Sequence, residues 1–235
     1  VMIKISRSGI EQFLNCQRCF VLQYKHRIRL RSLPFTLNSA VDNLCKNEFD
    51  YYREKQEPHP LFIEHNIDAV PFKHSDMDKW RNSLHHGISH QVEGTNIILH
   101  GGIDDLWHDL VLDQLIVVDY KSQASKYPVR TKSYLESPYH QGYKIQMDTY
   151  AFIIEKMGFN VHDTSYFYVC NADRNADGFN SYMVFEETLV PYKWNTGWIE
   201  PKLSEMIKIL NSTELPDSNN ACENCAYASQ RSVIE

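Results

Sequence analysis

The sequence predicts an α/β domain in which a central mixed sheet is flanked by helices. Segments with helical patterns lie toward both ends of the chain, and most segments with strand patterns are grouped between them. One strand, residues 115–121, is an apolar run that ends in an acid and a lysine two positions apart. The 235 residues fit a single unit, so we expect one domain over residues 1–235.

The first part of the chain is dominated by helical patterns. Ser8 followed by Glu11 forms a capping-box pattern and predicts a helix over residues 8–24. Pro34 at a first-turn position predicts a second helix that runs to about residue 53. A loop with two prolines then leads to a short segment over residues 77–86.

Strand and helix patterns alternate in the rest of the chain. The predicted strands are residues 97–106, 115–121, 165–171 and 182–186. Residues 107–114 are expected to form a hairpin-like connection, and residues 122–137 a long polar loop of the kind that often carries function. Helices are expected over residues 138–157 and 194–210, followed by a polar tail.

The composition is typical of a soluble globular protein. Hydrophobic residues make up 43% and charged residues 23%, and no apolar run is long enough to span a bilayer. We see no signal peptide and expect a cytoplasmic protein without a membrane partner. The net charge of −6 does not by itself indicate a nucleic-acid partner. A basic group that follows the acidic strand is the better indication of one, and it comprises Lys121, Lys126, Arg130 and Lys132.

The end of the apolar strand carries residues suited to catalysis. Asp119 and Lys121 share one face of the strand, because residues two apart point to the same side. A second acid, Asp104, lies upstream in a glycine-containing stretch. Two such carboxylates, with the main-chain carbonyl of Tyr120, can hold Mg²⁺ or Mn²⁺ for phosphodiester cleavage, and the lysine can position water or offset phosphate charge. The alternative is a turn acid and an exposed ion pair.

Three segments, in this order, resemble the motifs of the PD-(D/E)XK nuclease superfamily, in its RecB-like exonuclease branch. They are Gly101-Gly102-Ile103-Asp104, Val117-Val118-Asp119-Tyr120-Lys121 and Gln146-Met147-Asp148-Thr149-Tyr150. The resemblance implies a restriction-endonuclease-like core built on a central mixed sheet. It implies catalytic roles for Asp104, Asp119, Lys121, Gln146 and Tyr150.

Two details concern the metal ligands. Asp104 rather than Asp105 occupies the motif position, and it shares strand parity with Gly102. The superfamily often carries Gly-x-x-x-His in the helix before the sheet, and that histidine contacts the metal. Here residues 38–42 fill this place and end in Asp42. Asp42 is either a replacement oxygen ligand suited to Mg²⁺ or a surface residue, and the sequence leaves both open.

Two Cys-x-x-Cys pairs lie near the chain ends, Cys16 with Cys19 and Cys222 with Cys225. Together they form a ligand set for Zn²⁺ or an iron–sulfur cluster. Iron–sulfur members of the resembled branch have one N-terminal and three C-terminal cysteines, which fasten the two ends together. Residues 226–235 lack the last of these, and Cys19 supplies the fourth thiol instead. The resemblance implies a [4Fe–4S] cluster, whereas the two-plus-two pairing favours Zn²⁺.

The other two cysteines, Cys45 and Cys170, lie in apolar segments, which predicts buried thiols. Disulfides are not expected in a cytoplasmic chain. The domain is then expected to divide into an N-terminal helix with its cysteine pair (1–33), the nuclease core (34–211) and a C-terminal cysteine tail (212–235).

These motifs predict a Mg²⁺- or Mn²⁺-dependent DNA nuclease, an exonuclease acting on single-stranded DNA or on DNA ends. We expect any helicase or recombination partner to be a separate chain, with DNA repair or recombination as the setting. One alternative is a nucleic-acid-binding module that kept the fold without catalysis, which the missing helix histidine favours. Another is a sequence- or structure-specific endonuclease, against which the cysteine set argues.

Overall fold

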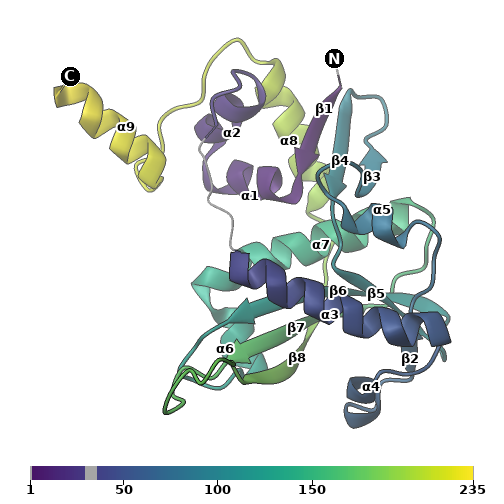
Figure 1. The fold of residues 1–235 in the computed structure, drawn as a ribbon. Helices are drawn as coiled ribbons and strands as arrows, with labels where there is room; N and C mark the ends of the chain where they lie inside the picture. Colours follow the sequence, from purple (N-terminus) through teal and green to yellow (C-terminus); the bar gives the residue numbers. More distant parts are fainter. Residues whose placement is uncertain (1, 30–35, 235) are drawn as a thin grey trace.

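The computed structural model describes residues 2–29 and 36–234 and has two β-sheets with helices packed around them (Figure 1). The larger sheet has the strand order β2-β5-β6-β7-β8. Its strands are β2 (Ala69–Pro71), β5 (Asp105–Asp109), β6 (Gln114–Gln123), β7 (Thr164–Ala172) and β8 (Phe185–Lys193). β6 and β7 are parallel and the other neighbours antiparallel, so the central sheet is mixed, as predicted.

Helices cover both faces of this sheet. α3 (Thr36–Lys55) crosses one face, where Phe49 stacks on Trp107 with ring centroids 5.5 Å apart. α7 (Gln141–Lys156) covers the other face, and its Met147 belongs to a separate buried core that also contains Phe167. Two shorter helices, α4 (Pro60–Glu64) and α6 (Thr131–Glu136), lie at the margins of the sheet.

The alternation of side chains along β6 decides which face carries Asp119. Ile116 and Val118 belong to the core under α3, whereas Leu115 and Val117 belong to the core under α7. Because successive side chains on a strand point to opposite faces, Asp119 points toward α7. The strand therefore brings a carboxylate into the second core.

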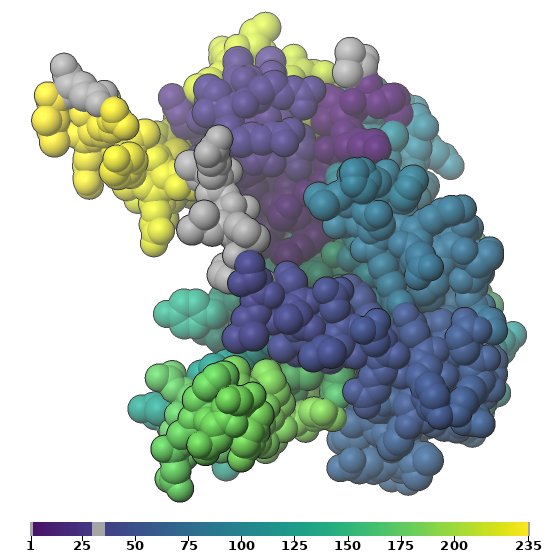
Figure 2. All heavy atoms as spheres, in the orientation of Figure 1, coloured from purple at the N-terminus to yellow at the C-terminus, as the bar shows by residue number. Residues whose placement is uncertain are grey.

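The smaller sheet has the order β1-β4-β3 and lies with helices from both chain ends (Figure 1). Its strands are β1 (Ile3–Ser6), β4 (Ile97–Gly101) and β3 (Ile88–Gln91). The remaining helical elements are α1 (Arg7–Asn15), α2 (Gln17–Tyr24), α5 (Met77–Arg81), η1 (Pro138–His140), α8 (Ile199–Asn211) and α9 (Glu223–Ile234). α9 projects from the body of the molecule, as Figure 2 also shows, and Cys225 is its one buried residue. No helix in the described part of the chain is long and apolar enough to cross a membrane.

The first predicted helix is in fact two helices. α1 begins one residue earlier than expected, and Ser6 rather than Ser8 is its N-cap, accepting a 3.3 Å hydrogen bond from the N–H of Gly9. The break falls at Cys16, which has an extended backbone. The Cys16 Sγ accepts a hydrogen bond from the N–H of Cys19. Cys16 is therefore the N-cap of α2, and the chain changes direction at this residue.

Other boundaries also differ from the expectation. Residues 97–106 form parts of two strands in different sheets, because the chain bends between Gly102 and Asp104. The predicted polar loop contains α6, the polar tail contains α9, and the strand expected at 182–186 is β8, which begins only at Phe185. The predicted helix start at Pro34 lies outside the described residues.

A buried ionic group joins α3, α5 and the central sheet. The carboxylate of Asp105 is fully buried and receives both Arg53 Nη2 and Arg81 Nη2, the latter at 3.1 Å. The Tyr120 hydroxyl donates to it at 2.7 Å and the main-chain N–H of Leu106 at 2.9 Å. Both oxygens of this carboxylate therefore accept hydrogen bonds, and two of the donors are cationic, which makes a charge inside the fold tolerable.

A second acid extends this group toward the surface. Asp50 accepts a hydrogen bond from Arg53 Nε at 2.9 Å and from Arg81 Nη1 at 2.8 and 2.9 Å. Arg53 Nη1 also donates to the main-chain oxygen of Phe72 at 2.6 Å. Through these bonds α3 is held at a defined position over the sheet.

We expect Asp105→Ala to lower the free energy of unfolding by about 3–5 kcal/mol, because it leaves the guanidinium groups of Arg53 and Arg81 without their buried carboxylate partner and with only the more exposed Asp50. Asp104→Ala, on the neighbouring and more exposed acid, should cost clearly less. Urea denaturation of both variants and the wild type measures the difference. Equal losses for the two variants would contradict a structural role for Asp105.

Candidate active site

Asp104 lies in the bend between β4 and β5, beside the part of β6 that β5 does not cover. Its Oδ2 accepts a 2.9 Å hydrogen bond from the main-chain N–H of Tyr120. Arg81 Nε donates to the main-chain oxygen of Asp104 at 3.0 Å and holds the bend. The N–H and C=O of a strand residue point to the same side, so the Tyr120 carbonyl also faces the Asp104 side.

Asp119 is fully buried and lies at the centre of a group of polar side chains. Gln146 Nε2 on α7 donates to Asp119 Oδ1, and the Lys121 ammonium contacts Asp119 Oδ2. Lys121 Nζ also donates to Gln146 Oε1 at 3.3 Å, and Gln146 Nε2 lies 3.2 Å from the Tyr150 hydroxyl oxygen that accepts its hydrogen bond. Four of the five residues expected to act in catalysis thus form one bonded group.

The two glycines of the first motif have packing roles beside this group. A Cβ on Gly101 would lie 2.4 Å from Cε1 of the Tyr150 ring, so only glycine lets that ring approach the strand. A Cβ on Gly102 would lie 2.6 Å from the Cβ of Ser83. The motif therefore leaves room for α7 on one side and for the segment after α5 on the other.

The ionisation of Asp119 is shifted by its surroundings. Burial raises its pKa to about 7, while the Lys121 ammonium lowers this pKa and the Asp104 carboxylate raises it. Burial, with the charge of Asp104, also raises the pKa of Asp42. Asp104 therefore acts electrostatically on a carboxylate from β6 and on one from α3.

Helix α3 adds a lysine that the sequence analysis missed. Lys46 Nζ lies 2.7 Å from Asp42 Oδ2 and 3.6 Å from Asp104 Oδ1. Residues four apart on a helix share a face, so the spacing of Asp42, Lys46 and Asp50 was an available signal. The Asp42 side chain is 29% exposed and ion-paired, so it is part of the site's surroundings, and its role as a metal ligand stays a prediction.

The residues after β6 extend positive charge from the site to the surface. Lys126, Arg130 and Lys132 are exposed, as a contact surface for phosphates requires. Lys121 itself is half-buried, with Nζ 4.6 Å from the centre of the Tyr143 ring.

The donors at this site suit a hard divalent cation. Carboxylates and a main-chain carbonyl are the ligands that Mg²⁺ and Mn²⁺ take. The buried Asp119 Oδ2 receives no hydrogen bond of good geometry despite its contact with Lys121, so it keeps acceptor capacity for a cation. Over residues 2–29 and 36–234, only the four paired cysteines bring three or more His, Cys, Asp or Glu ligand atoms within 4.8 Å of each other.

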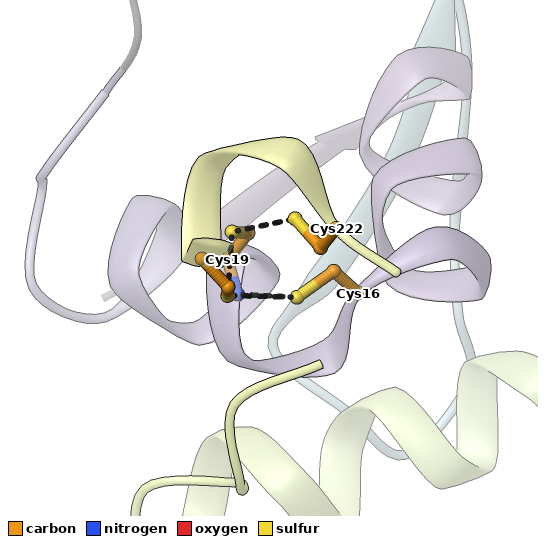
Figure 3. A group of neighbouring side chains, drawn as sticks. Cys16, Cys19 and Cys222 are labelled. Carbon is orange, nitrogen blue, oxygen red and sulfur yellow. Dashed lines mark hydrogen bonds between the residues drawn. The ribbon is translucent and has the colours of Figure 1, made fainter. Parts of the chain in front are cut away.

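The two cysteine pairs meet between α2 and the start of α9 (Figure 3). The Sγ atoms of Cys16 and Cys225 are 3.6 Å apart, and Cys19 Sγ lies 3.7 Å from Cys222 Sγ and 3.8 Å from Cys225 Sγ. All four sulfurs lie within 4.8 Å of one another, as a single tetrahedral metal site requires. The expected four-cysteine group is therefore assembled.

Cys45 on α3 and Cys170 on β7 are both buried and free. Their sulfurs are 3.9 Å apart, far beyond a disulfide bond of about 2.05 Å. The prediction of buried thiols at these positions is confirmed.

Residues 36–230 match the family model described as the PD-(D/E)XK nuclease superfamily. The match covers most of the chain, and the protein belongs to this superfamily. The predicted α/β fold, a restriction-endonuclease-like core with a central mixed sheet flanked by helices, is confirmed. Assignment to the RecB-like branch, and to its iron–sulfur type, stays a prediction.

Two solved structures resemble the chain path at low identity. A protein from Eubacterium rectale described as a candidate exonuclease is 15% identical, with a TM-score of 0.46 over 95% of this chain and 87% of its own. An alkaline exonuclease from Laribacter hongkongensis is 10% identical, with a TM-score of 0.40 over 98% and 94%. At these values neither likeness bears on what this chain cleaves. A search of curated sequences gives no significant match.

The raised pKa of Asp119 predicts how stability depends on pH. The folded state favours the neutral acid, so its contribution to stability is largest below the ordinary pKa of 3.8 and is lost as pH rises to about 7. We expect Asp119→Asn, which cannot ionise, to gain melting temperature relative to the wild type between pH 4 and pH 7. Thermal melts of both proteins without divalent metal test this, and parallel profiles would contradict it.

Proposed function

We propose that this protein is a metal-dependent DNA nuclease that degrades single-stranded DNA or DNA ends. The observation that carries the proposal is the buried Asp119, bonded to Gln146 and in contact with Lys121, in a chain of the nuclease superfamily. Membership supports phosphodiester cleavage. The preference for DNA and the exonuclease mode rest on the resemblance of the three motifs to the RecB-like branch.

In this proposal Asp104, Asp119 and the Tyr120 carbonyl hold Mg²⁺ or Mn²⁺. Such an ion, when bound, polarises the scissile phosphate and lowers the pKa of a water molecule. The N–H of Tyr120 keeps Asp104 in place, and the Gln146 amide does the same for Asp119. Both carboxylates are thus oriented before substrate binds, which reduces the reorganisation needed for the reaction.

Lys121 is placed to act on the substrate itself. Its ammonium orients the attacking water and offsets the charge that grows on the phosphate oxygens. The water oxygen forms a bond to phosphorus and releases one proton to solvent, the opposite phosphorus–oxygen bond breaks, and the leaving sugar oxygen takes up a proton from solvent. Gln146 bonds both Asp119 and Lys121, so it sets their separation, and Tyr150 accepts from Gln146 and fixes its amide.

For the cysteine group we propose a single Zn²⁺ ion with a structural role. Zn–S bonds of about 2.3 Å in a tetrahedron place ligand sulfurs about 3.8 Å apart. The observed sulfur separations of 3.6, 3.7 and 3.8 Å agree with this value. A [4Fe–4S] cluster, which the motif resemblance implies, binds each cysteine to a different iron and needs wider spacing. The ion would fasten the C-terminal segment to the N-terminal helices.

Two alternatives differ in what they do to DNA. A binding module without catalysis is favoured by Asp42, which stands where the superfamily often has a metal-binding histidine. A sequence- or structure-specific endonuclease would make discrete internal cuts instead of degrading from ends. The cleavage products therefore distinguish all three possibilities.

We expect the wild type to degrade end-labelled single-stranded DNA with Mg²⁺ or Mn²⁺ and not with EDTA. Asp119→Asn and Lys121→Met should each lower the rate by about 100-fold or more, because the first removes a carboxylate that holds the metal ion and the second removes the cation that acts on the phosphate. Lys193→Met, at a lysine that is 78% exposed, serves as the matched control and should keep full activity.

Each product pattern has a defined meaning in this assay. A ladder of short fragments that grows from one end supports an exonuclease and shows its polarity. Discrete internal fragments support the endonuclease instead. DNA binding without cleavage by the wild type, with its cysteine metal retained, would reject the nuclease proposal in favour of the binding module.

The cysteine proposal predicts about one zinc per chain, no visible absorbance, and loss of this zinc in Cys222→Ser. Cys45→Ser removes a buried cysteine outside the group and should keep the metal. Elemental analysis of the purified proteins measures this. A coloured protein with about four irons per chain would instead establish the iron–sulfur alternative.

A further inference from the structure

We propose that Lys46 is a fixed cation of the active site that occupies the position of a second divalent metal ion. The chain would then bind one catalytic ion, not two. This inference rests on the proposed nuclease function and deepens it, because it specifies how many metal ions the site takes.

The contacts of Lys46 place it between carboxylates from separate parts of the fold. Its Nζ lies 2.7 Å from Asp42 Oδ2 on its own helix and 3.6 Å from Asp104 Oδ1 in the bend before β5. The Lys46 side chain is only 18% exposed, so its ammonium is held at the site and is not a mobile surface charge. Lys46 thus shares Asp104 with the proposed metal position.

This sharing resembles the arrangement of a two-metal site. In such sites the two ions lie about 3.5–4 Å apart with carboxylates between them. Here the second oxygen of Asp104, Oδ2, accepts from the Tyr120 N–H, while Oδ1 faces Lys46. Asp42 is paired with the same ammonium. Both carboxylates that a second ion would need are therefore already in contact with the Lys46 ammonium.

The charge balance of the site supports the same conclusion. Three carboxylates converge from α3, the bend and β6, and two ammonium groups accompany them. Lys121 pairs with Asp119, and Lys46 pairs with Asp42 and Asp104. Three carboxylates and two ammonium groups leave one net negative charge, which attracts one divalent ion. With that ion bound the group is net positive, and a second ion would also be repelled by Lys46 at close range.

The position of Lys46 is enforced by the rest of α3. Asp50, one turn further along the same face, accepts two hydrogen bonds from Arg81 Nη1. Arg81 in turn holds the main-chain oxygen of Asp104. Arg81 therefore ties the bend to α3 one turn beyond the lysine, which restricts the movement of Asp104 relative to Lys46.

Mn²⁺ binding to the whole purified chain, with its cysteine metal in place, tests the inference without relying on activity. Titrations followed by electron paramagnetic resonance of free Mn²⁺ count the bound ions. We expect one ion for the wild type and for Lys46→Arg. Lys46→Met and Lys46→Gln should bind two, because Asp42 and Asp104 become available to a second cation.

The double variant Asp42→Asn with Lys46→Met is the matched control. It lacks the second carboxylate, so it should return to one ion. Asp119→Asn should lose the first ion, which assigns that ion to the proposed catalytic position. Circular dichroism and thermal melts confirm that each variant is folded before its ions are counted.

Two ions in the wild type, or one ion in both Lys46→Met and Lys46→Gln, would overturn the role of Lys46 while leaving the nuclease proposal intact. If Asp119→Asn binds as many ions as the wild type, the proposed metal-dependent function is overturned, and this inference with it. The two failures are thus distinguished by the same set of titrations.

Discussion

The fully buried carboxylate of Asp105 is the interaction on which the geometry of the site depends. It accepts hydrogen bonds from guanidinium groups on α3 and α5, from a hydroxyl on β6 and from the N–H of Leu106. Because these donors come from separate segments, the helix over the sheet and the bend before β5 cannot move independently. The two adjacent acids therefore have different roles. Asp105 holds elements of the fold together, and the Asp104 side chain faces the candidate site.

The site is built at a cost in stability that the surrounding bonds limit. A carboxylate as deeply buried as Asp119 would destabilise the fold if it were charged and unpaired. Gln146 and Lys121 reduce this cost, and they also keep the carboxylate in one orientation. Such tension between local stability and a preformed polar site is common where proteins carry function.

The parts of this arrangement that depend on the spacing of residues close together in the sequence could be predicted from the sequence. The alternation of β6 and the i, i+4 spacing of Gln146 and Tyr150 are local features, and the structure brings both elements together. The break at Cys16 escaped prediction because the capping atom is a cysteine sulfur, which is not among the usual N-cap groups.

Long-range partners could not be predicted in the same way. Arg53, Arg81 and Lys46 lie on helices where solvated charges are the usual expectation, and their partners are distant in sequence. Only the folded chain shows that these charges are inside or beside the core. The short strands β1, β2 and β3 were also missed, and β1 and β2 are each defined by pairing with a remote strand.

The projecting helix α9 has a thermodynamic consequence. It has twelve residues, of which Cys225 alone is buried, and a helix of this length is marginal in water without tertiary contacts. Its folding free energy must therefore come largely from the cysteine group at its first turn. α9 should behave as a separate cooperative unit. Its backbone amides should exchange with solvent through local opening, at a free-energy cost well below that of global unfolding. With the proposed zinc ion in the cysteine group, the folded population of α9 would follow the occupancy of that ion.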